Sequence, residues 1–322
     1  MKRVALLLII TLALGVFACA SPQEAAPPPV NVILMSWDGV HQEAIRELLA
    51  PGVVGWGEQV PTRLPGLKTL IAEGKLSCEV IVTHATDTKA GHAQMLTGYE
   101  PEVTGVYDNA NFQEMPTGLT IFERLEARFG DEIATIMVKA KTTNIGRQKG
   151  EPFYNACRPD NSLHTDWVVE PAPGGDNSAG WVGGKMLEAL DKYGKGRFFA
   201  FFHFADPDVA GHFHGEGSAD YRNAIVTCDD WLGKVVTKLK ELGVYDQTLL
   251  YVTADHGFTP GTTDHSRAPF VWLATNDPAI LRGGNQGDIV PTILRRFGID
   301  PRSVTPPFGI GLPEAVSGPP SR

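Results

Sequence analysis

A short turn between an apolar run and a helix-compatible segment carries hydroxyl groups suited to nucleophilic chemistry. The apolar run covers residues 78–82, the turn contains Thr83, Thr86 and Thr88, and the helical segment begins at His92. A strand that breaks into such a turn places it at the carboxyl edge of a sheet, where free N–H groups can bind an anion. One of the three hydroxyls could therefore be an attacking nucleophile, although threonines in such turns more often cap the helix. We refer to this segment with Thr83, Thr86 and Thr88 as the nucleophile turn.

Aspartates and histidines follow several other predicted strands. They are Asp38 after residues 31–37, Asp206 and Asp208 after residues 198–204, Asp255 and His256 after residues 248–253, and Asp264 and His265 in the next loop. In an open parallel sheet, ligands bind at the carboxyl ends of the strands. Aspartate oxygens and histidine nitrogens are suitable ligands for zinc or a similar divalent ion. Any one of these residues could be a helix cap or a packed side chain, but their common placement predicts a metal site.

Strands and helices alternate along the chain, and these elements must position the polar residues. Strands are expected at residues 31–37, 78–82, 133–138, 198–204, 248–253 and 270–274, and helices at residues 41–49, 67–72, 92–96, 120–129, 179–193, 218–242 and 288–297. This alternation predicts an α/β fold with a mostly parallel central sheet. Residues 141–176 show no clear period, and we interpret them as an insertion beside the site.

The N-terminal region has the layout of a secretory signal peptide. Lys2 and Arg3 precede an apolar run over residues 4–14, which is short for a membrane span, and small residues follow. Residues 16–19 resemble a bacterial lipobox. This motif predicts that a signal peptide of residues 1–18 is cleaved and that Cys19 is lipidated; the alternative is ordinary cleavage after Ala20. Residues 19–30 would then form a Pro/Ala-rich tether to a catalytic domain at residues 31–322. The expected location is the bacterial periplasm, anchored by lipid to the outer membrane, or, in the alternative, soluble secretion.

The chain is acidic, with a formal charge of −9 that would become −11 without residues 1–18. This balance argues against specific nucleic-acid binding, which usually requires a basic surface. If Cys19 carries lipid, the remaining cysteines are Cys78, Cys157 and Cys228, so at most one disulfide can form within the chain.

The motifs, taken as a set, resemble those of the alkaline phosphatase superfamily, and within it the type I phosphodiesterase/nucleotide pyrophosphatase branch. The resemblance covers residues 32 to about 300. It rests on Asp38-Gly39, Thr88 four residues before His92, Leu96-Thr97-Gly98, Gly105 to Asn109, Pro207-Asp208-x-x-Gly211-His212, Thr253 to Gly257, His265 and the helix opening Asp288-Ile289-Val290-Pro291-Thr292. It implies an alkaline phosphatase-like three-layer α/β/α fold.

The resemblance also implies the roles of individual residues. Thr88 would be the nucleophile and Asn109 would hydrogen-bond a substrate oxygen. Two zinc ions, or other divalent ions such as Mn²⁺, would be held by Asp208, His212 and His265 at one position and by Asp38, Asp255, His256 and Thr88 at the other. Three aspartates and a Thr88 alkoxide would balance the charge of two zinc ions, and ions about 4 Å apart can hold the attacking and leaving oxygens of a displacement.

The implied activity is hydrolysis of a small-molecule phosphoric ester, either a phosphodiester or a nucleotide pyrophosphate, through a phosphothreonine intermediate. The alternatives are a phosphomonoesterase or phosphonate hydrolase of the same superfamily and an inactive lipoprotein that binds a phosphate-bearing ligand. The C/S-x-P-x-R motif of sulfatases is absent from the nucleophile turn. The oligomeric state is not indicated.

Several assignments have rivals close by in the sequence. Asp206 competes with Asp208, and His203 and His214 compete with His212. Lys139 and Lys141 loosely resemble the Lys-x-Arg of threonine-type phosphomonoesterases, although lysine lacks the bidentate grip of arginine. If one of these lysines reached the site, a dianionic monoester would be favoured; the alternative is that both are solvated loop residues.

Overall fold

The computed structural model describes residues 31–50, 52–54, 58–60, 63–142, 144–145, 167–172, 174–280 and 283–307. The expected signal peptide, Cys19, the tether and most of the expected insertion at residues 141–176 lie outside the described residues. Within those ranges, no helix combines the length and apolar character that crossing a bilayer requires.

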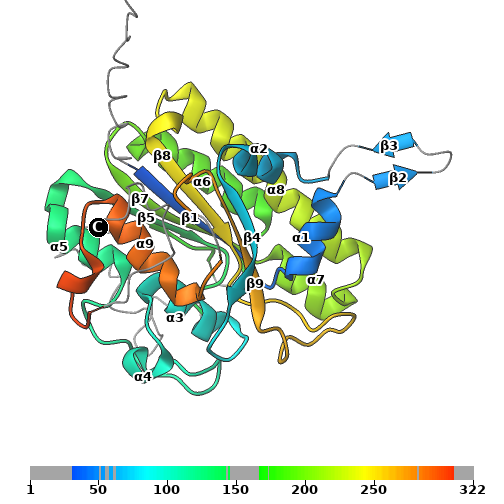
Figure 1. The fold of residues 1–322 in the computed structure, drawn as a ribbon, viewed down its shortest axis with the longest axis horizontal. Coiled ribbons are helices and arrows are strands. Elements are labelled where there is room, and N and C mark those ends of the chain that lie inside the picture. The colour runs from blue at the N-terminus through cyan, green and yellow to red at the C-terminus, as the bar shows by residue number, and fades with distance from the viewer. Residues whose placement is uncertain are drawn as a thin grey trace, which may run out of the picture.

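A seven-stranded sheet forms the centre of the molecule (Figure 1). Its strands are, in spatial order, β4 (Lys75–Ile81), β9 (Phe270–Thr275), β8 (Thr248–Thr253), β1 (Asn31–Trp37), β7 (Phe198–Phe204), β5 (Ala134–Lys139) and β6 (Trp167–Val169). The strands from β8 to β6 pair in parallel, whereas β9 is antiparallel to both of its neighbours. The prediction of a mostly parallel sheet is therefore confirmed. A separate antiparallel pair is formed by β2 (Gly52–Val54) and β3 (Glu58–Val60).

The central strands are buried along their whole length. Strand β1 has the sequence NVILMSW and β7 the sequence FFAFFHF, and every residue of both strands is buried. Continuous apolar runs of this kind are typical of parallel strands that are covered on both faces. Strand β1 lies between β7 and β8 in register, so the carboxyl ends of these three strands meet at one edge of the sheet.

Helices cover both faces of the sheet (Figure 1). Helices α2 (Pro65–Glu73), α6 (Ala179–Tyr193) and α7 (Asp206–His214) pack on α8 (Ala219–Glu241), and α3 (Thr88–Thr97) and α5 (Ile121–Phe129) pack on α9 (Ile289–Arg296). The other helices among the described residues are α1 (Gln42–Leu49), α4 (Pro101–Thr104) and the short 3₁₀ turns η2 (Gly130–Glu132), η3 (Tyr245–Gln247), η4 (Gln286–Asp288) and η5 (Pro301–Ser303). This arrangement confirms the three-layer α/β/α architecture.

Some elements differ from the sequence-based expectation. Helix α3 begins at Thr88 rather than at His92, because Asp87 caps it by accepting a hydrogen bond from the Ala90 N–H. Helix α7 is not apparent from apolar periodicity, since it is short and mixes acidic, small and histidine residues, although Pro207 suits the first turn of a helix. Strand β6 lies within the region expected to be an insertion without regular structure.

Candidate active site

The nucleophile turn places Thr88 in the first turn of α3, where it is buried. Its Oγ1 lies 3.2 Å from the Nζ of Lys141. The helix lies very close to the loop that follows β8. A Cβ added to Gly91 would come within 2.5 Å of the Asp255 carbonyl oxygen. A glycine at this position therefore allows the helix to contact that loop through its backbone.

The two rival threonines have other partners. Thr83 donates a hydrogen bond to the carboxylate of Glu100 at 2.8 Å, and Thr86 donates to the backbone carbonyl of His265. Of the three hydroxyls, the structure brings only that of Thr88 to Lys141. Thr86 instead connects the nucleophile turn to the loop that carries His265.

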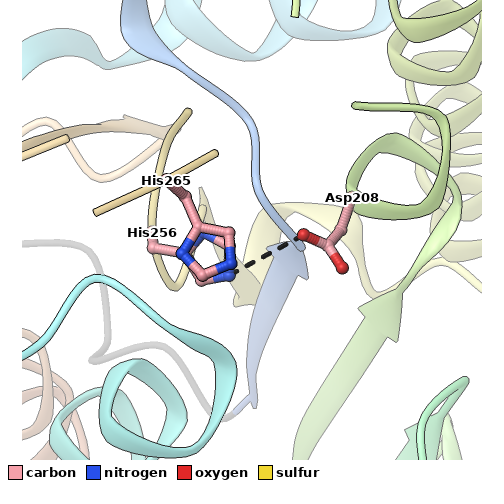
Figure 2. Close-up of side chains that lie close together, drawn as sticks. All are labelled: Asp208, His256 and His265. Carbon is pink, nitrogen blue, oxygen red and sulfur yellow. Dashed lines mark ion pairs between the residues drawn. The ribbon is translucent and has the colours of Figure 1, made fainter. Parts of the chain in front are cut away.

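Three carboxylates meet at the edge where β1, β7 and β8 end. Asp38 follows β1, Asp255 follows β8, and Asp208 lies in the first turn of α7 directly after β7. Together with two histidines they form groups whose ligand atoms lie within 4.8 Å of one another: Asp38, Asp255 and His256 in one, and Asp208, His256 and His265 in the other. Figure 2 shows His256 and His265 side by side and facing Asp208.

His256 lies between the two groups. Its Nε2 is 3.4 Å from Asp38 Oδ1, 3.5 Å from Asp255 Oδ2 and 3.9 Å from Asp208 Oδ1, and its Nδ1 lies 3.1 Å from the Gly257 carbonyl. Because a carbonyl can only accept, Nδ1 carries a proton and Nε2 is the nitrogen that faces the carboxylates. A backbone contact on one ring nitrogen is the usual way in which a histidine ligand is oriented.

His212 lies next to Asp208, one helical turn farther along α7. Its Nε2 is 3.3 Å from Asp208 Oδ1, and its Nδ1 lies 3.0 Å from the Thr263 carbonyl. Its ring also contacts that of His265, with centroids 5.1 Å apart. His212 is exposed, unlike the carboxylates, and therefore borders the site on its solvent side.

Four buried polar atoms at the centre of this cluster lack a hydrogen-bond partner: Asp38 Oδ1, Asp208 Oδ1, Asp255 Oδ2 and His256 Nε2. Buried polar atoms without partners are rare and call for an explanation such as an ion. Carboxylate oxygens and an imidazole nitrogen are the donor set that zinc and similar divalent ions use. The residues therefore fit a metal centre.

The electrostatics of the cluster also favour a cation. Burial raises the pKa of Asp38 and Asp208, but the Lys141 ammonium and the neighbouring histidines together outweigh this effect and hold both pKa values below their usual range. Burial and the Asp38 charge raise the pKa of Asp255. Burial would lower the pKa of His256, but the surrounding carboxylates raise it. A concentration of negative charge that retains protons on Asp255 and His256 would also stabilise a divalent ion.

Lys141 reaches the centre of the site and Lys139 does not. The Nζ of Lys141 lies 2.7 Å from Asp38 Oδ2 and 2.7 Å from Asp208 Oδ2, in addition to its contact with Thr88. Lys139 is fully buried, lies 3.1 Å from the Glu170 carboxylate and donates to the backbone carbonyl of Ile145. The alternative left open by the sequence is resolved differently for each lysine: Lys141 faces the site, whereas Lys139 holds the loop that follows β5.

Asn109 lies beside the nucleophile turn. Its Oδ1 accepts a hydrogen bond from the Lys89 N–H at 2.9 Å, and its own N–H donates to Asp87 at 2.7 Å. With the side-chain oxygen oriented in this way, the exposed amide Nδ2 is the group that can donate to a ligand near Thr88.

The remaining rivals occupy other positions. Asp206 accepts a hydrogen bond from the Ala179 N–H at 2.9 Å and so caps α6, and His214 is exposed, 4.0 Å from Asp220. His203 contacts Asp38 at 3.0 Å from beneath the site rather than facing the other carboxylates. A role of this kind was not predicted, although His203 is the only polar residue in the β7 sequence FFAFFHF.

Comparison with known proteins gives a family match over most of the chain. Residues 32–296 match the model of the family described as type I phosphodiesterase/nucleotide pyrophosphatase. A 2,3-bisphosphoglycerate-independent phosphoglycerate mutase from Clostridium botulinum is 34% identical over 163 residues, which are 44% of this chain and 30% of that protein. The bis(5'-adenosyl)-triphosphatase ENPP4 of Bos taurus is 22% identical over 266 residues, which are 82% of this chain and 54% of that protein.

A solved structure shares the fold. Inactive murine ectonucleotide pyrophosphatase/phosphodiesterase 5 in complex with AMP superposes with a TM-score of 0.56 at 13% identity, over 83% of this chain and 95% of that one. The chain thus spans about half or less of the two curated relatives, but most of this structural neighbour. Since the family match covers residues 32–296, the protein belongs to the type I phosphodiesterase/nucleotide pyrophosphatase family, as the motifs predicted.

Proposed function

We propose that the protein is a metal-dependent hydrolase of small-molecule phosphoric esters. The observation that carries this proposal is the convergence of Asp38, Asp208, Asp255 and His256 on one sheet edge beside Thr88, with four buried polar atoms that lack partners. Family membership supports the same activity.

Two divalent ions, zinc in the first instance and Mn²⁺ as the alternative, would occupy the two groups. Asp38, Asp255 and His256 would hold one ion together with Thr88, and Asp208, His212 and His265 the other. Because His256 lies close to carboxylates of both groups, we expect its replacement to weaken binding at both positions. Such ions would lower the pKa of a hydroxyl and stabilise the negative charge that develops on phosphoryl oxygens.

The chain's own groups would perform the remaining steps. The Thr88 oxygen would attack phosphorus, the bond from phosphorus to the leaving oxygen would break, and water would then hydrolyse the phosphothreonine. The Asn109 amide would donate to a phosphoryl oxygen, and the N–H groups at the start of α3 would add positive potential at the same place. Gly91 would keep Thr88 close to Asp255 throughout.

Phosphodiesters and nucleotide pyrophosphates are the first substrate class we propose. The curated relative ENPP4 is named as a bis(5'-adenosyl)-triphosphatase, and the structural neighbour holds AMP, a nucleotide product of the kind such a hydrolase would release. A small nucleotide ester is consistent with a site that lies at the sheet edge and is bordered by the exposed residues Asn109 and His212.

Phosphomonoesters are a second candidate class, which Lys141 specifically favours. Its ammonium lies 3.2 Å from the Thr88 oxygen, where the phosphoryl group would be attacked. A monoester dianion has one more charged oxygen than a diester, and a fixed cation at that position would stabilise it.

Export and lipid anchoring belong to the same proposal and rest on the sequence alone. The signal-like residues 1–18 and the lipobox-like Cys19 support a periplasmic enzyme attached to the outer membrane, with soluble secretion as the alternative.

A panel of chromogenic substrates tests the activity and the substrate class together. Bis-p-nitrophenyl phosphate, p-nitrophenyl phosphate and p-nitrophenyl sulfate would be compared, with metal content measured on the same preparation. We expect close to two divalent ions per chain, hydrolysis of phosphate esters that a chelator abolishes and zinc restores, and little hydrolysis of sulfate. An active preparation without bound metal would refute the metal-dependent mechanism, and a metal-loaded, folded protein inactive on all phosphate esters would refute the activity.

A further inference from the structure

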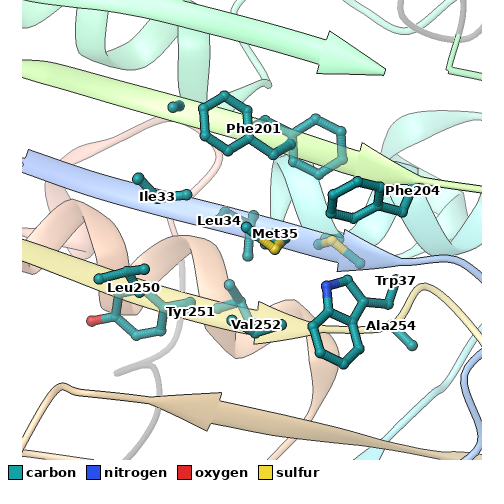
Figure 3. Packing of buried hydrophobic residues seen from close by; sticks show 14 of the residues in the cluster. Ile33, Leu34, Met35, Trp37, Phe201, Phe204, Leu250, Tyr251, Val252 and Ala254 are labelled. Carbon is teal, nitrogen blue, oxygen red and sulfur yellow. The ribbon is translucent and has the colours of Figure 1, made fainter. Parts of the chain in front are cut away.

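A buried histidine beneath the site has no role in the mechanism described above. His203 belongs to β7 and is fully buried. Figure 3 shows Phe201 and Phe204 of the same strand packed in the apolar core with residues of β1 and β8. An imidazole in such surroundings is unfavourable unless its nitrogens have partners, so its contacts indicate why the position is polar.

Both ring nitrogens of His203 have a partner, and the partners determine where the ring proton lies. Nδ1 accepts a hydrogen bond from the backbone N–H of Ala140 at 3.1 Å, so the proton of the neutral ring is on Nε2. Nε2 lies 3.0 Å from Asp38 Oδ2 and donates to it. The ring also packs against the His92 ring, 4.9 Å away at 89°, and the nearly parallel Phe201 ring, 6.5 Å away.

These contacts determine which oxygen of Asp38 faces the centre of the site. Oδ2 is occupied by His203 and by Lys141, whereas Oδ1 lacks a partner and lies 3.4 Å from His256 Nε2. Since Ala140 directly precedes Lys141, the same ring also holds the backbone from which Lys141 extends. One side chain thus connects the carboxylate after β1 with the end of β5.

We propose that His203 is a positioning residue that orients Asp38 so that Oδ1 is presented to a divalent ion. The inference rests on the proposed function, because it concerns an ion at the Asp38, Asp255 and His256 group. Removing a hydrogen-bond partner of a metal ligand typically weakens metal affinity 10- to 100-fold, and that is the effect expected here.

The experiment measures zinc affinity at a fixed pH by competition with a chromophoric chelator, with bound zinc counted by elemental analysis. His203→Phe removes both hydrogen bonds, and His203→Asn keeps a polar side chain that is too short to reach Asp38. His203→Gln retains an amide N–H that can donate to Asp38 Oδ2. Phe199→Leu is the matched control, because Phe199 is equally buried on the same face of β7 and packs on Phe122 instead of on Asp38. Circular dichroism in the presence of a chelator checks folding.

We expect one of the two zinc ions to bind 10- to 100-fold more weakly in His203→Phe and His203→Asn, with most of the affinity recovered in His203→Gln and unchanged in Phe199→Leu. Wild-type affinity in a folded His203→Phe or His203→Asn protein would overturn the positioning role alone. The same holds if His203→Gln binds zinc as weakly as His203→Asn, because the donated hydrogen bond would then be irrelevant. A wild-type protein that binds no zinc would overturn the metal centre itself, together with this inference.

Discussion

Replacing Lys141 by methionine would remove the ammonium charge while keeping an unbranched side chain of similar shape. Lys141 lies 3.2 Å from the Thr88 oxygen and is the cation placed between Asp38 and Asp208. If it stabilises the additional charge of a monoester, Lys141→Met should lower kcat/KM for a monoester more than for a diester.

The magnitude follows from the type of contact. A hydrogen bond from a charged group contributes about 1.5–3 kcal/mol, and the side chain is only 17% exposed, so solvent screening is limited. At about 1.4 kcal/mol for each factor of ten, kcat/KM for p-nitrophenyl phosphate should fall about 10- to 150-fold. The value for bis-p-nitrophenyl phosphate should fall much less, since a diester lacks the second charge.

The assay compares the two substrates on one preparation, with zinc content measured in parallel. Removing a cation that is paired with Asp38 and Asp208 leaves more negative charge at the site, so zinc should bind at least as tightly as in the wild type. Lys185→Met is a suitable control, because Lys185 pairs with Glu188 on the surface of α6. An equal decrease in kcat/KM for both substrates would refute the role of Lys141 in stabilising the additional charge of a monoester. A decrease in zinc content would show that Lys141 supports the metal centre instead.

Three further predictions concern other parts of the chain. Thr88→Ala should lower turnover by several orders of magnitude with zinc retained, whereas Thr83→Ala should remain close to wild type; steady-state kinetics giving the reverse order would show that the nucleophile is wrongly assigned. Asp229 of α8 is buried and accepts hydrogen bonds from the first N–H groups of α2, and burial raises its pKa from 3.8 to about 6. The folded state therefore holds this proton more tightly than the unfolded state does. As the pH falls from about 6 to about 4, the free energy of unfolding of the wild type, relative to that of Asp229→Asn, should rise by up to about 3 kcal/mol. Urea unfolding at several pH values measures this change, and the opposite slope would contradict the prediction. Cys19→Ser should release the protein from the membrane fraction of its host if Cys19 is lipidated; an unchanged distribution on fractionation would instead favour soluble secretion.

The residues that end buried strands could be predicted from the sequence because the strands themselves are continuous apolar runs. Asp38, Asp208 and Asp255 each follow such a run, and parallel strands bring their carboxyl ends together. The short apolar-to-turn transition likewise indicated Thr88, although the start of α3 depended on the cap that Asp87 provides.

Other features of the site depend on contacts between distant segments, which a local pattern does not contain. Lys141 contacts Asp38 and Asp208, whereas Lys139, two residues earlier, is buried and contacts the Ile145 carbonyl in the loop after β5. His203 could be noticed as a polar residue in an apolar strand, but its partner Asp38 is 165 positions away. His256 was expected at one metal position, and its place between two groups depends on the packing of Asp208 against the loop after β8.

The contact between Gly91 and the Asp255 carbonyl limits how the enzyme could be altered. The helix that carries Thr88 lies directly on the main chain that carries Asp255, with no side chain between them that could be exchanged for a longer or shorter one. The distance between the Thr88 hydroxyl and the Asp255 carboxylate is consequently determined by direct backbone contact, which substitutions of other side chains leave unchanged. Attempts to change substrate preference by mutation should therefore vary Asn109, Lys141 and their surroundings and retain glycine at position 91.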